Sequence, residues 1–529
     1  MKKVTYTPDG ELKIEWRLPG AQWKETKDNV KSLDGRTFSP KLKCWFAPAT
    51  AENLEKLKLW GFDIPETTEP EPDNWTAPWL ELELSRTVPD YLRPYQIEVM
   101  KFLKYRNGRG LIGEPMGAGK TVMGLSFLQM SKQFPALIVV PATIKIQWAR
   151  EWYKFIQTAD EVDILYGQTP VPLTPGKSYI INWDILLYWK DELAQLDFKT
   201  LIADESHRAG NPKAQRTKAL KQLARKIPYF LPMSGTPIKT KPRQFFPILN
   251  MIDKEEWDNE YFFLQRYCDP VFDGFGWNFD GASNLKELHQ RVRDYMIRHD
   301  KSEILKDLPE KSVSVLPLPI TGSTEAYQAQ LKKFLESSGL ESQEEFNNLK
   351  IQAFVLKQKL VLEWIKDFIQ SGEKILIGTY HRKVIKFLSD AFKDKSVCIY
   401  GGVSAKQREL ALDEFKNNNN VQILFGQILS AGEGIDGLQN VCHNCAFVEF
   451  AHSPSDHDQF EARLHRSGQK NPTNVYYLVA EDTIEIDMAE SLDEKRKTFD
   501  AVINGVETEQ ENFIIYLKNK YGAYETQEN

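Results

Sequence analysis

The stretch "LIGEPMGAGKTVMGL" combines the residue types that bind a triphosphate. An apolar strand runs into a glycine-rich turn, whose backbone N–H groups can point inward, and a lysine adds a charge for the outer phosphates. The following threonine hydroxyl can ligate Mg²⁺. The strict pattern requires glycine five residues before Gly119, where this chain has Glu114. We therefore predict a nucleotide-binding loop of the shorter GxGKT form, made by Gly117, Ala118, Gly119, Lys120 and Thr121.

A second acidic site follows in "TLIADESH", where Asp204 and Glu205 end an apolar strand. Asp204 is suited to a Mg²⁺ contact, usually through water, and Glu205 to a general base that polarises the attacking water. A solvated acidic turn is the alternative interpretation. A nucleotide switch does not need an adjacent base, whereas hydrolysis does, so the pair favours a hydrolase.

Two arginines stand three residues apart in "QFEARLHRSGQ", at Arg463 and Arg466. In a single helical turn both guanidinium groups would leave the same face. The neighbouring residues give no carboxylate pattern that would claim both. The anion that they bind must therefore come from another part of the chain.

The composition excludes several classes of protein. A chain of 529 residues exceeds one hydrophobic core and predicts about three to four folding units. No apolar run approaches the ~20 residues that cross a bilayer, and no apolar segment follows the first basic residues, so we expect an intracellular chain without membrane contact. The net charge of −6 argues against coating nucleic acid by bulk charge. Cys442 and Cys445 form a lone C-x-x-C, and because a zinc site needs a second pair, we interpret them as buried structural residues.

Apolar runs and charge divide the chain into segments. "VTYTPDGELKIEW" predicts a β-hairpin, and a short helix follows at "AENLEKLKLWGF". Two series of buried strands alternating with helices then predict two α/β lobes with parallel sheets. The predicted division is a small α+β domain at 1–65, an acidic Pro-rich linker at 66–84, a first lobe at 85–250, a helical insertion at 251–350, a second lobe at 351–500 and a helical tail at 501–529.

Eight segments in order resemble the helicase motifs of superfamily two. They are "LRPYQIEVMKFL", "GEPMGAGKT", "ALIVVPATIKIQWAREW", "DESH", "MSGTP", "KILIGTYHRKVIKFL", "LSAGEGIDGLQN" and "QFEARLHRSGQ". The ending "HRSGQ" is similar to the Swi/Snf family of DNA-dependent ATPases, over roughly residues 85 to 500. The motifs "DESH" and "YHRKVIKFL" and the acidic residue in "QFEARLHR" look most like the annealing-helicase, fork-remodelling branch of that family. Members of this branch carry a HARP-type domain before the motor. Residues 1–65 resemble that domain, and a generic packing module is the alternative.

The resemblance implies roles for individual residues. Both RecA-like lobes would share one ATP site, and Arg463 and Arg466 would reach across the cleft as arginine fingers on the γ-phosphate. Gln96 resembles the glutamine that reads adenine. Asp436 departs from the asparagine that is common in Swi/Snf proteins. The residues expected to sense the nucleotide are Gly434 and Asp436, and those expected to couple it to the lobe interface are Ser234, Gly235 and Thr236.

Translocases of this type hold the sugar-phosphate backbone, so double-stranded or forked DNA is the expected partner, bound without sequence specificity. Base stacking by Trp148 competes with a place in the core, and a DNA contact by Lys145 competes with a solvated surface position. The candidate DNA contacts are Lys145, Trp148, Arg208, His381, Arg382 and Lys383.

The predicted function is an ATP- and Mg²⁺-dependent translocase on double-stranded DNA, with reannealing of forks or branch migration as the sharper hypothesis. A strand-separating DNA or RNA helicase remains an alternative, because the catalytic motifs hardly differ. An ATP-gated scaffold is weakened because Lys120, Glu205 and both arginines are present. We expect a monomer in a bacterial or viral cytoplasm, or in the nucleus of a eukaryote; protein partners leave no trace in the sequence.

Overall fold

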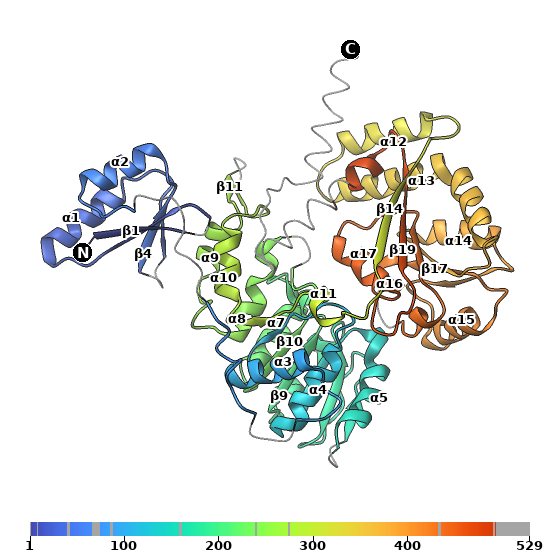
Figure 1. Cartoon of the computed structure of the whole chain (residues 1–529), viewed down its shortest axis with the longest axis horizontal. Helices are drawn as coiled ribbons and strands as arrows, with labels where there is room; N and C mark the ends of the chain where they lie inside the picture. Colours follow the sequence, from blue (N-terminus) through green and yellow to red (C-terminus); the bar gives the residue numbers. More distant parts are fainter. Residues whose placement is uncertain are drawn as a thin grey trace.

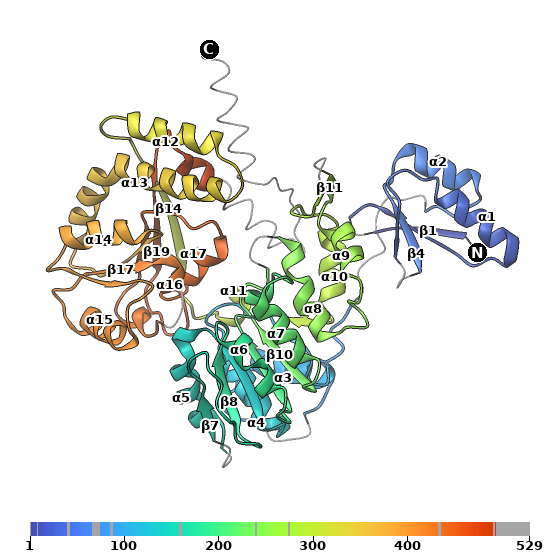
Figure 2. The ribbon, with the colours of Figure 1, turned by 180° about the vertical axis from the view of Figure 1, so that it is seen from behind.

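Three bodies of secondary structure follow one another along the chain in this computed structural model (Figure 1). A small domain at the N-terminus lies beside the helices of the first lobe, and the second lobe lies on the far side (Figure 2). The described residues are 2–7, 9–39, 43–65, 75–84, 88–157, 161–238, 241–272, 276–431, 435–489 and 492.

The N-terminal domain is an antiparallel sheet with two helices, as predicted from its hairpin. The apolar residues that alternate along β1 and β2, such as Val4 and Ile14, point into a common core with Leu57 of the second helix. The elements are β1 (Lys2–Tyr6), β2 (Leu12–Trp16), α1 (Gly20–Val30), β3 (Thr37–Ser39), β4 (Cys44–Ala47) and α2 (Ala51–Leu59), with sheet order β1-β2-β4-β3.

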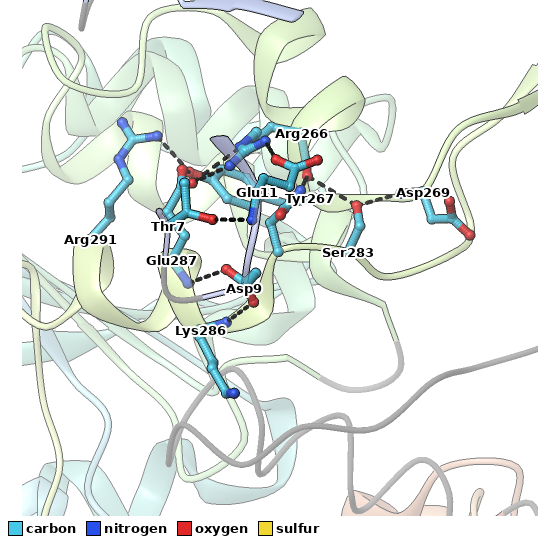
Figure 3. Close-up of polar contacts among 11 residues, drawn as sticks. Thr7, Asp9, Glu11, Arg266, Tyr267, Asp269, Ser283, Lys286, Glu287 and Arg291 are labelled. Atoms are coloured by element: carbon cyan, nitrogen blue, oxygen red, sulfur yellow. Dashed lines mark hydrogen bonds and ion pairs between the residues drawn. The ribbon is translucent and has the colours of Figure 1, made fainter. Parts of the chain in front are cut away.

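The turn of the first hairpin attaches this domain to the first lobe (Figure 3). The Asp9 carboxylate accepts hydrogen bonds from the backbone N–H groups of Lys286, at 2.9 Å, and Glu287, at 2.8 Å. Both belong to the first turn of α10 (Leu285–Val292), whose N–H groups have no partner inside the helix. The hairpin therefore caps a helix that lies some 280 residues further along the chain.

A buried arginine strengthens the same contact (Figure 3). Arg266, at the end of α9 (Glu260–Tyr267), is 2% exposed; it pairs with Glu11 of the hairpin and lies 2.5 Å from Glu287. Its guanidinium also lies over the ring of Phe46, 3.9 Å from the centroid. Burial by itself lowers the pKa of Arg266, but the carboxylates of Glu287 and Glu11 together raise it above its ordinary value, so the side chain stays charged. The N-terminal domain is therefore held to the first lobe by paired buried charges.

Arg266→Met is expected to lower the free energy of unfolding by about 3 to 5 kcal/mol, because it leaves the buried Glu287 carboxylate without its guanidinium partner. Chemical denaturation checks this value. Arg225→Met, at an exposed arginine of the same lobe, is the matched control and should change stability by under about 0.5 kcal/mol. A loss below about 1 kcal/mol for Arg266→Met, the range of exposed ion pairs, would contradict the role.

The first lobe is built on a seven-stranded parallel sheet of order β13-β5-β10-β9-β6-β8-β7. Its central strands read as unbroken apolar runs because helices cover both faces. The strands are β5 (Leu111–Ile112), β6 (Ala136–Val140), β7 (Val162–Ile164), β8 (Ser178–Asn182), β9 (Thr200–Asp204), β10 (Tyr229–Met233) and β13 (Met296–Ile297). The remaining helices are α3 (Pro94–Tyr105), α4 (Lys120–Ser131), α5 (Lys145–Phe155), α6 (Leu186–Leu193), α7 (Gln215–Ala224) and α8 (Phe246–Ile252), and β11 (Val271–Phe272) pairs with β12 (Trp277–Asn278).

The second lobe is a six-stranded parallel sheet of order β14-β19-β18-β15-β17-β16. The predicted fold class of two α/β lobes with parallel sheets, preceded by a small α+β domain, is confirmed. The strands are β14 (Lys311–Leu318), β15 (Ile375–Thr379), β16 (Ser396–Ile399), β17 (Ile423–Gln427), β18 (Asn444–Phe447) and β19 (Thr473–Ala480). The helices are α12 (Glu325–Glu336), α13 (Gly339–Ile369), α14 (Arg382–Ala391), α15 (Ala405–Asn417), α16 (Ile428–Ala431) and α17 (Pro454–Glu461).

Two predicted segments differ from the structure. The range 251–350 is more than a helical insertion, because β13 joins the first sheet and β14 joins the second through pairing with β19. These are edge strands, one of two residues and one with exposed valines, so their apolar signal is weak. The second half of the predicted linker packs on the first lobe, since Trp79 is 4% exposed against Phe102. Residues 66–74 and the predicted tail at 501–529 lie outside the described residues.

Both cysteines of the C-x-x-C stretch are buried in the second lobe. Burial raises the pKa of the Cys442 thiol to about 12, so it stays protonated at neutral pH. In the described part of the chain, no three His, Cys, Asp or Glu side chains are grouped as a metal site would require. The two thiols therefore act as small apolar residues.

Candidate active site between the two lobes

The predicted phosphate loop connects β5 to α4. Gly117 and Gly119 have φ angles of 85° and 84°, which favour glycine and turn the backbone inward. Lys120 is the first residue of the helix, and its Nζ donates to the carbonyl oxygens of Glu114, at 2.8 Å, and Pro115, at 3.2 Å. Burial lowers the pKa of Lys120, while the carboxylates at the end of β9 oppose that shift. These two hydrogen bonds hold the Lys120 side chain against the first residues of the loop, where it could contact a bound phosphate group.

The predicted carboxylate pair stands at the end of β9. Asp204 is buried, and the indole Nε1 of Trp148 donates to its Oδ2 at 3.0 Å. Burial and the neighbouring Glu205 carboxylate raise the pKa of Asp204 to about 7. A divalent cation would lower that pKa again, so the site suits Mg²⁺ beside the Thr121 hydroxyl. Glu205 has a left-handed backbone, with φ of 51°, which marks a tight turn after the strand.

The two arginines come from turns and not from one helix. Helix α17 ends at Glu461, which corrects the expected helical turn over Arg463 and Arg466. Arg463 donates to the carbonyl oxygen of Ile435 at 3.2 Å, and Arg466 forms an ion pair with Asp436. Successive turns after the helix nevertheless leave both guanidinium groups on the side that faces the first lobe.

Both lobes contribute side chains to one pocket. Its walls include Lys120, Thr121, Asp204 and Glu205 from the first lobe, and Asp436, Arg463 and Arg466 from the second. Two hydrogen bonds cross the same gap: Gln147 Nε2 donates to Asp436 Oδ2 at 2.6 Å, and Arg93 donates to Ser467 Oγ at 3.1 Å. Sequence reasoning did not single out Gln147 or Arg93, although both lie inside quoted motifs. Gly434 lies outside the described residues.

Gln96 holds the phosphate loop from the side. Its Nε2 donates to the carbonyl oxygen of Ala118 at 3.0 Å, and its Oε1 accepts from the backbone N–H of Arg93 at 3.0 Å. The hydroxyl of Tyr95 donates to the same Ala118 carbonyl at 2.9 Å. The amide therefore has partners at both ends within the lobe, and its contact with adenine stays a prediction.

The predicted coupling turn is connected to Glu205, the predicted general base, through His207. Its Nδ1 lies 3.0 Å from Ser234 Oγ and 3.2 Å from Glu205 Oε2. The backbone N–H of Thr236 also donates to Ser234 Oγ at 3.1 Å. A Cβ at Gly235 would lie 2.8 Å from the Met116 side chain of the phosphate loop, so any larger residue would require that side chain to shift.

Two of the predicted DNA contacts, Lys145 and Trp148, have buried side chains, and for Trp148 this favours the alternative of a place in the core. Lys145 is 7% exposed, donates to the carbonyl oxygen of Leu165 at 2.9 Å and lies over the ring of Tyr166. Trp148 is 1% exposed and holds Asp204 by its hydrogen bond. The apolar stem of lysine and the apolar indole both pack into the first lobe, which satisfies the polar end of each internally.

The other candidate DNA contacts differ in exposure. Arg208 is half-buried beside the acidic motif. The Nδ1 of His381 lies 2.6 Å from Glu449 Oε1, which fixes the imidazole at the end of β15. Arg382 and Lys383 are exposed at the first turn of α14. Among the six candidate residues, only Arg382 and Lys383 have exposed, positively charged side chains that a DNA phosphate could reach from solvent.

Sequence reasoning also missed a charged cluster behind the phosphate loop. Glu114 is 0% exposed and lies 2.7 Å from Nδ1 of His299, whose Nε2 lies 3.1 Å from Glu98. Burial alone lowers the pKa of His299, but the two carboxylates outweigh it and raise that pKa to about 9. Glu114, which replaces the glycine of the strict loop pattern, is therefore paired. Glu114 and Glu98 precede His299 by 185 and 201 positions, and no sequence signal could link residues so far apart.

A model of the SNF2-related domain matches residues 95–365, more than half of the chain, and a model of the helicase conserved C-terminal domain matches 357–468. The chain belongs to the SNF2-related family. The two matched domains follow each other along the chain in the same order as the two lobes. Together they identify the chain as a helicase-like ATPase. The predicted resemblance to Swi/Snf ATPases is thus confirmed.

Curated relatives include human DNA annealing helicase and endonuclease ZRANB3, 28% identical over 79% of this chain and 41% of the relative. The SWI/SNF-related matrix-associated actin-dependent regulator of chromatin subfamily A-like protein 1 of Xenopus laevis is 29% identical over 77% of this chain and 43% of its own length. The chain thus spans about two fifths of these relatives.

Among solved structures, the Sulfolobus solfataricus SWI2/SNF2 ATPase core in complex with dsDNA matches with 22% identity and a TM-score of 0.40, over 80% of this chain and 95% of that one. Among the helices described here, none has the length and apolar character to span a bilayer.

Proposed function

We propose that this chain is an ATP-driven translocase on double-stranded DNA. The observation that carries the proposal is the shared pocket, in which Lys120 and Glu205 of one lobe face Arg463 and Arg466 of the other. Hydrolysis at such a site requires the lobes to be closed, and each cycle of closure and opening can move the lobes along a strand.

The residues divide the chemistry between the lobes. The backbone of the phosphate loop and Lys120 hold the phosphates, and Thr121 and Asp204 would hold Mg²⁺, which neutralises charge on the phosphate oxygens when bound. Glu205 orients the attacking water and takes its proton. The two arginines stabilise the charge that develops on the transferred phosphoryl group.

The relatives support the DNA part of the proposal, because those named above are annealing helicases and chromatin regulators. Arg382 and Lys383 are exposed at the start of α14 and offer positive charge on the second lobe. A chain of net charge −6 must hold DNA through such local groups, with the backbone phosphates as the main contact.

Reannealing of forked DNA is the finer part of the proposal. Its support is the relative named a DNA annealing helicase and the presence of a separate N-terminal domain, bound to the first lobe through Asp9 and through the pair of Glu11 with Arg266. In this arrangement the domain is attached to the first lobe, and its proposed role is to contact the DNA beside the motor. A HARP-type role for the domain belongs to this finer proposal.

Steady-state ATP hydrolysis tests the proposal, measured without nucleic acid and then with single-stranded DNA, blunt duplex, forked DNA and double-stranded RNA at one fixed salt concentration. We expect stimulation by duplex and stronger stimulation by the fork. Stimulation by single strands or RNA alone would favour a strand-separating helicase. Absence of any stimulation would favour an ATP-gated scaffold.

A further inference from the structure

One segment of the chain crosses between the lobes beside the ATP pocket. It leaves the first sheet after β13 (Met296–Ile297) and enters the second at β14 (Lys311–Leu318). We call residues 298–310 the interlobe connection; it contains the short helix α11 (Lys301–Ile304). Figures 1 and 2 both show α11 where the two lobes meet.

The first residues of the connection are bound to the first lobe. Arg298 donates to the carbonyl oxygens of Gly113, at 2.5 Å, and Gly235, at 3.1 Å. His299 follows and pairs with Glu114 behind the phosphate loop. The start of the connection is therefore fixed to both the phosphate loop and the coupling turn.

The next residue with a long side chain reaches the second lobe. Lys301 Nζ donates to the carbonyl oxygen of His465 at 3.0 Å and lies 3.1 Å from His465 Nδ1. His465 Nε2 lies 2.9 Å from the carbonyl oxygen of Pro309, which can only accept, so the ring proton is on Nε2 and Nδ1 is free to accept from the lysine. Burial and the charge of Lys301 lower the pKa of His465 to about 4, consistent with this neutral ring.

His465 stands between the two arginines, and its carbonyl belongs to the peptide that leads into Arg466. At the other end of the arginine pair, Lys311 Nζ lies 2.7 Å from Glu461 Oε2, and Glu461 is 2% exposed and also accepts from the hydroxyl of Tyr477 at 2.9 Å. Lys301, inside the connection, thus holds the carbonyl oxygen just before Arg466, and Lys311, directly after the connection, pairs with the side chain of Glu461, two residues before Arg463.

We infer that the interlobe connection positions the arginine pair, and that Lys301 is a positioning residue for ATP hydrolysis through its hold on His465. Because Arg298 and His299 bind the same segment to the phosphate loop, a stretch of only four residues, from Arg298 to Lys301, connects the loop to the backbone just before Arg466. This inference rests on the proposed function, since it assigns Arg466 to the phosphate of bound ATP.

The test compares Lys301→Met with Lys301→Arg and with Lys306→Met, an exposed lysine of the same connection. With saturating duplex DNA, we expect kcat of Lys301→Met to fall by about 10²-fold, the cost of misplacing a reacting group by roughly 1 Å, with KM for ATP changed by under about twofold. Lys301→Arg, which can still donate to the carbonyl, should recover most of the loss, and Lys306→Met should behave as the unaltered chain.

A double variant separates positioning from a general loss of structure. If Lys301 acts through Arg466, then Lys301→Met added to Arg466→Ala should lower kcat little further, whereas independent effects would multiply. An unchanged kcat in Lys301→Met, or multiplied losses in the double variant, would overturn the inference while the unaltered chain still shows duplex-stimulated turnover. Absence of ATP hydrolysis by the unaltered chain would instead overturn the proposed function, and the inference with it.

Discussion

Glu205→Gln is expected to lower ATP turnover by about 10²- to 10⁴-fold, the contribution of a general base, while ATP still binds. The carboxylate stands at the end of β9 in the wall of the pocket and is oriented by His207 at 3.2 Å. Glutamine keeps the shape and the hydrogen-bonding capacity of the side chain but cannot take a proton. The lobes should therefore still close on ATP without completing the reaction.

Single-turnover hydrolysis and equilibrium nucleotide binding distinguish these two effects. Glu192→Gln, an exposed glutamate of α6, is the matched control and should leave both quantities unchanged. If Glu205→Gln kept turnover within about twofold of the unaltered chain, the base would have to be sought elsewhere, with Asp204 as the next candidate, since such a small change is far below the usual contribution of a general base.

Arg466→Ala and Arg463→Ala are each expected to lower duplex-stimulated turnover by about 10³- to 10⁵-fold, the range measured for arginine fingers. Both guanidinium groups line the pocket opposite Lys120. Replacement of Arg466 by lysine should restore little, because a lysine cannot present two N–H groups in a fixed plane. The affinity for ATP and for DNA should change by far less than turnover, because the phosphate loop and the DNA contacts lie elsewhere.

ATPase assays, together with separate binding assays for ATP and duplex DNA, check this prediction. Lys470→Ala is the matched control, since it removes an exposed cation four residues beyond Arg466. Normal turnover in Arg466→Ala would contradict the arginine-finger assignment and would leave Arg466 as a partner of Asp436 alone. Loss of ATP binding together with turnover would indicate a structural role in lobe closure.

The sequence by itself determined the parts of this protein that depend on close neighbours. The phosphate loop needs only a strand, glycines with positive φ and a helix that begins at Lys120, all within about a dozen residues. Asp204 ends a strand whose apolar residues predict its burial. The hairpin at the N-terminus follows from alternation around a Pro-Asp-Gly turn. Local patterns carry these features because backbone conformation and burial are set within a few residues.

Only the tertiary structure decided which distant groups meet. The burial of Lys145 and Trp148, the pairing of Glu114 with His299, and the capping of α10 by Asp9 each depend on segments that the sequence does not link. The same holds for the contact of Lys301 with His465, 164 residues away. Charge and hydrogen-bonding capacity are visible in a sequence, but the partner that satisfies a buried polar group is chosen by how the lobes pack. That packing places both arginines opposite the phosphate loop.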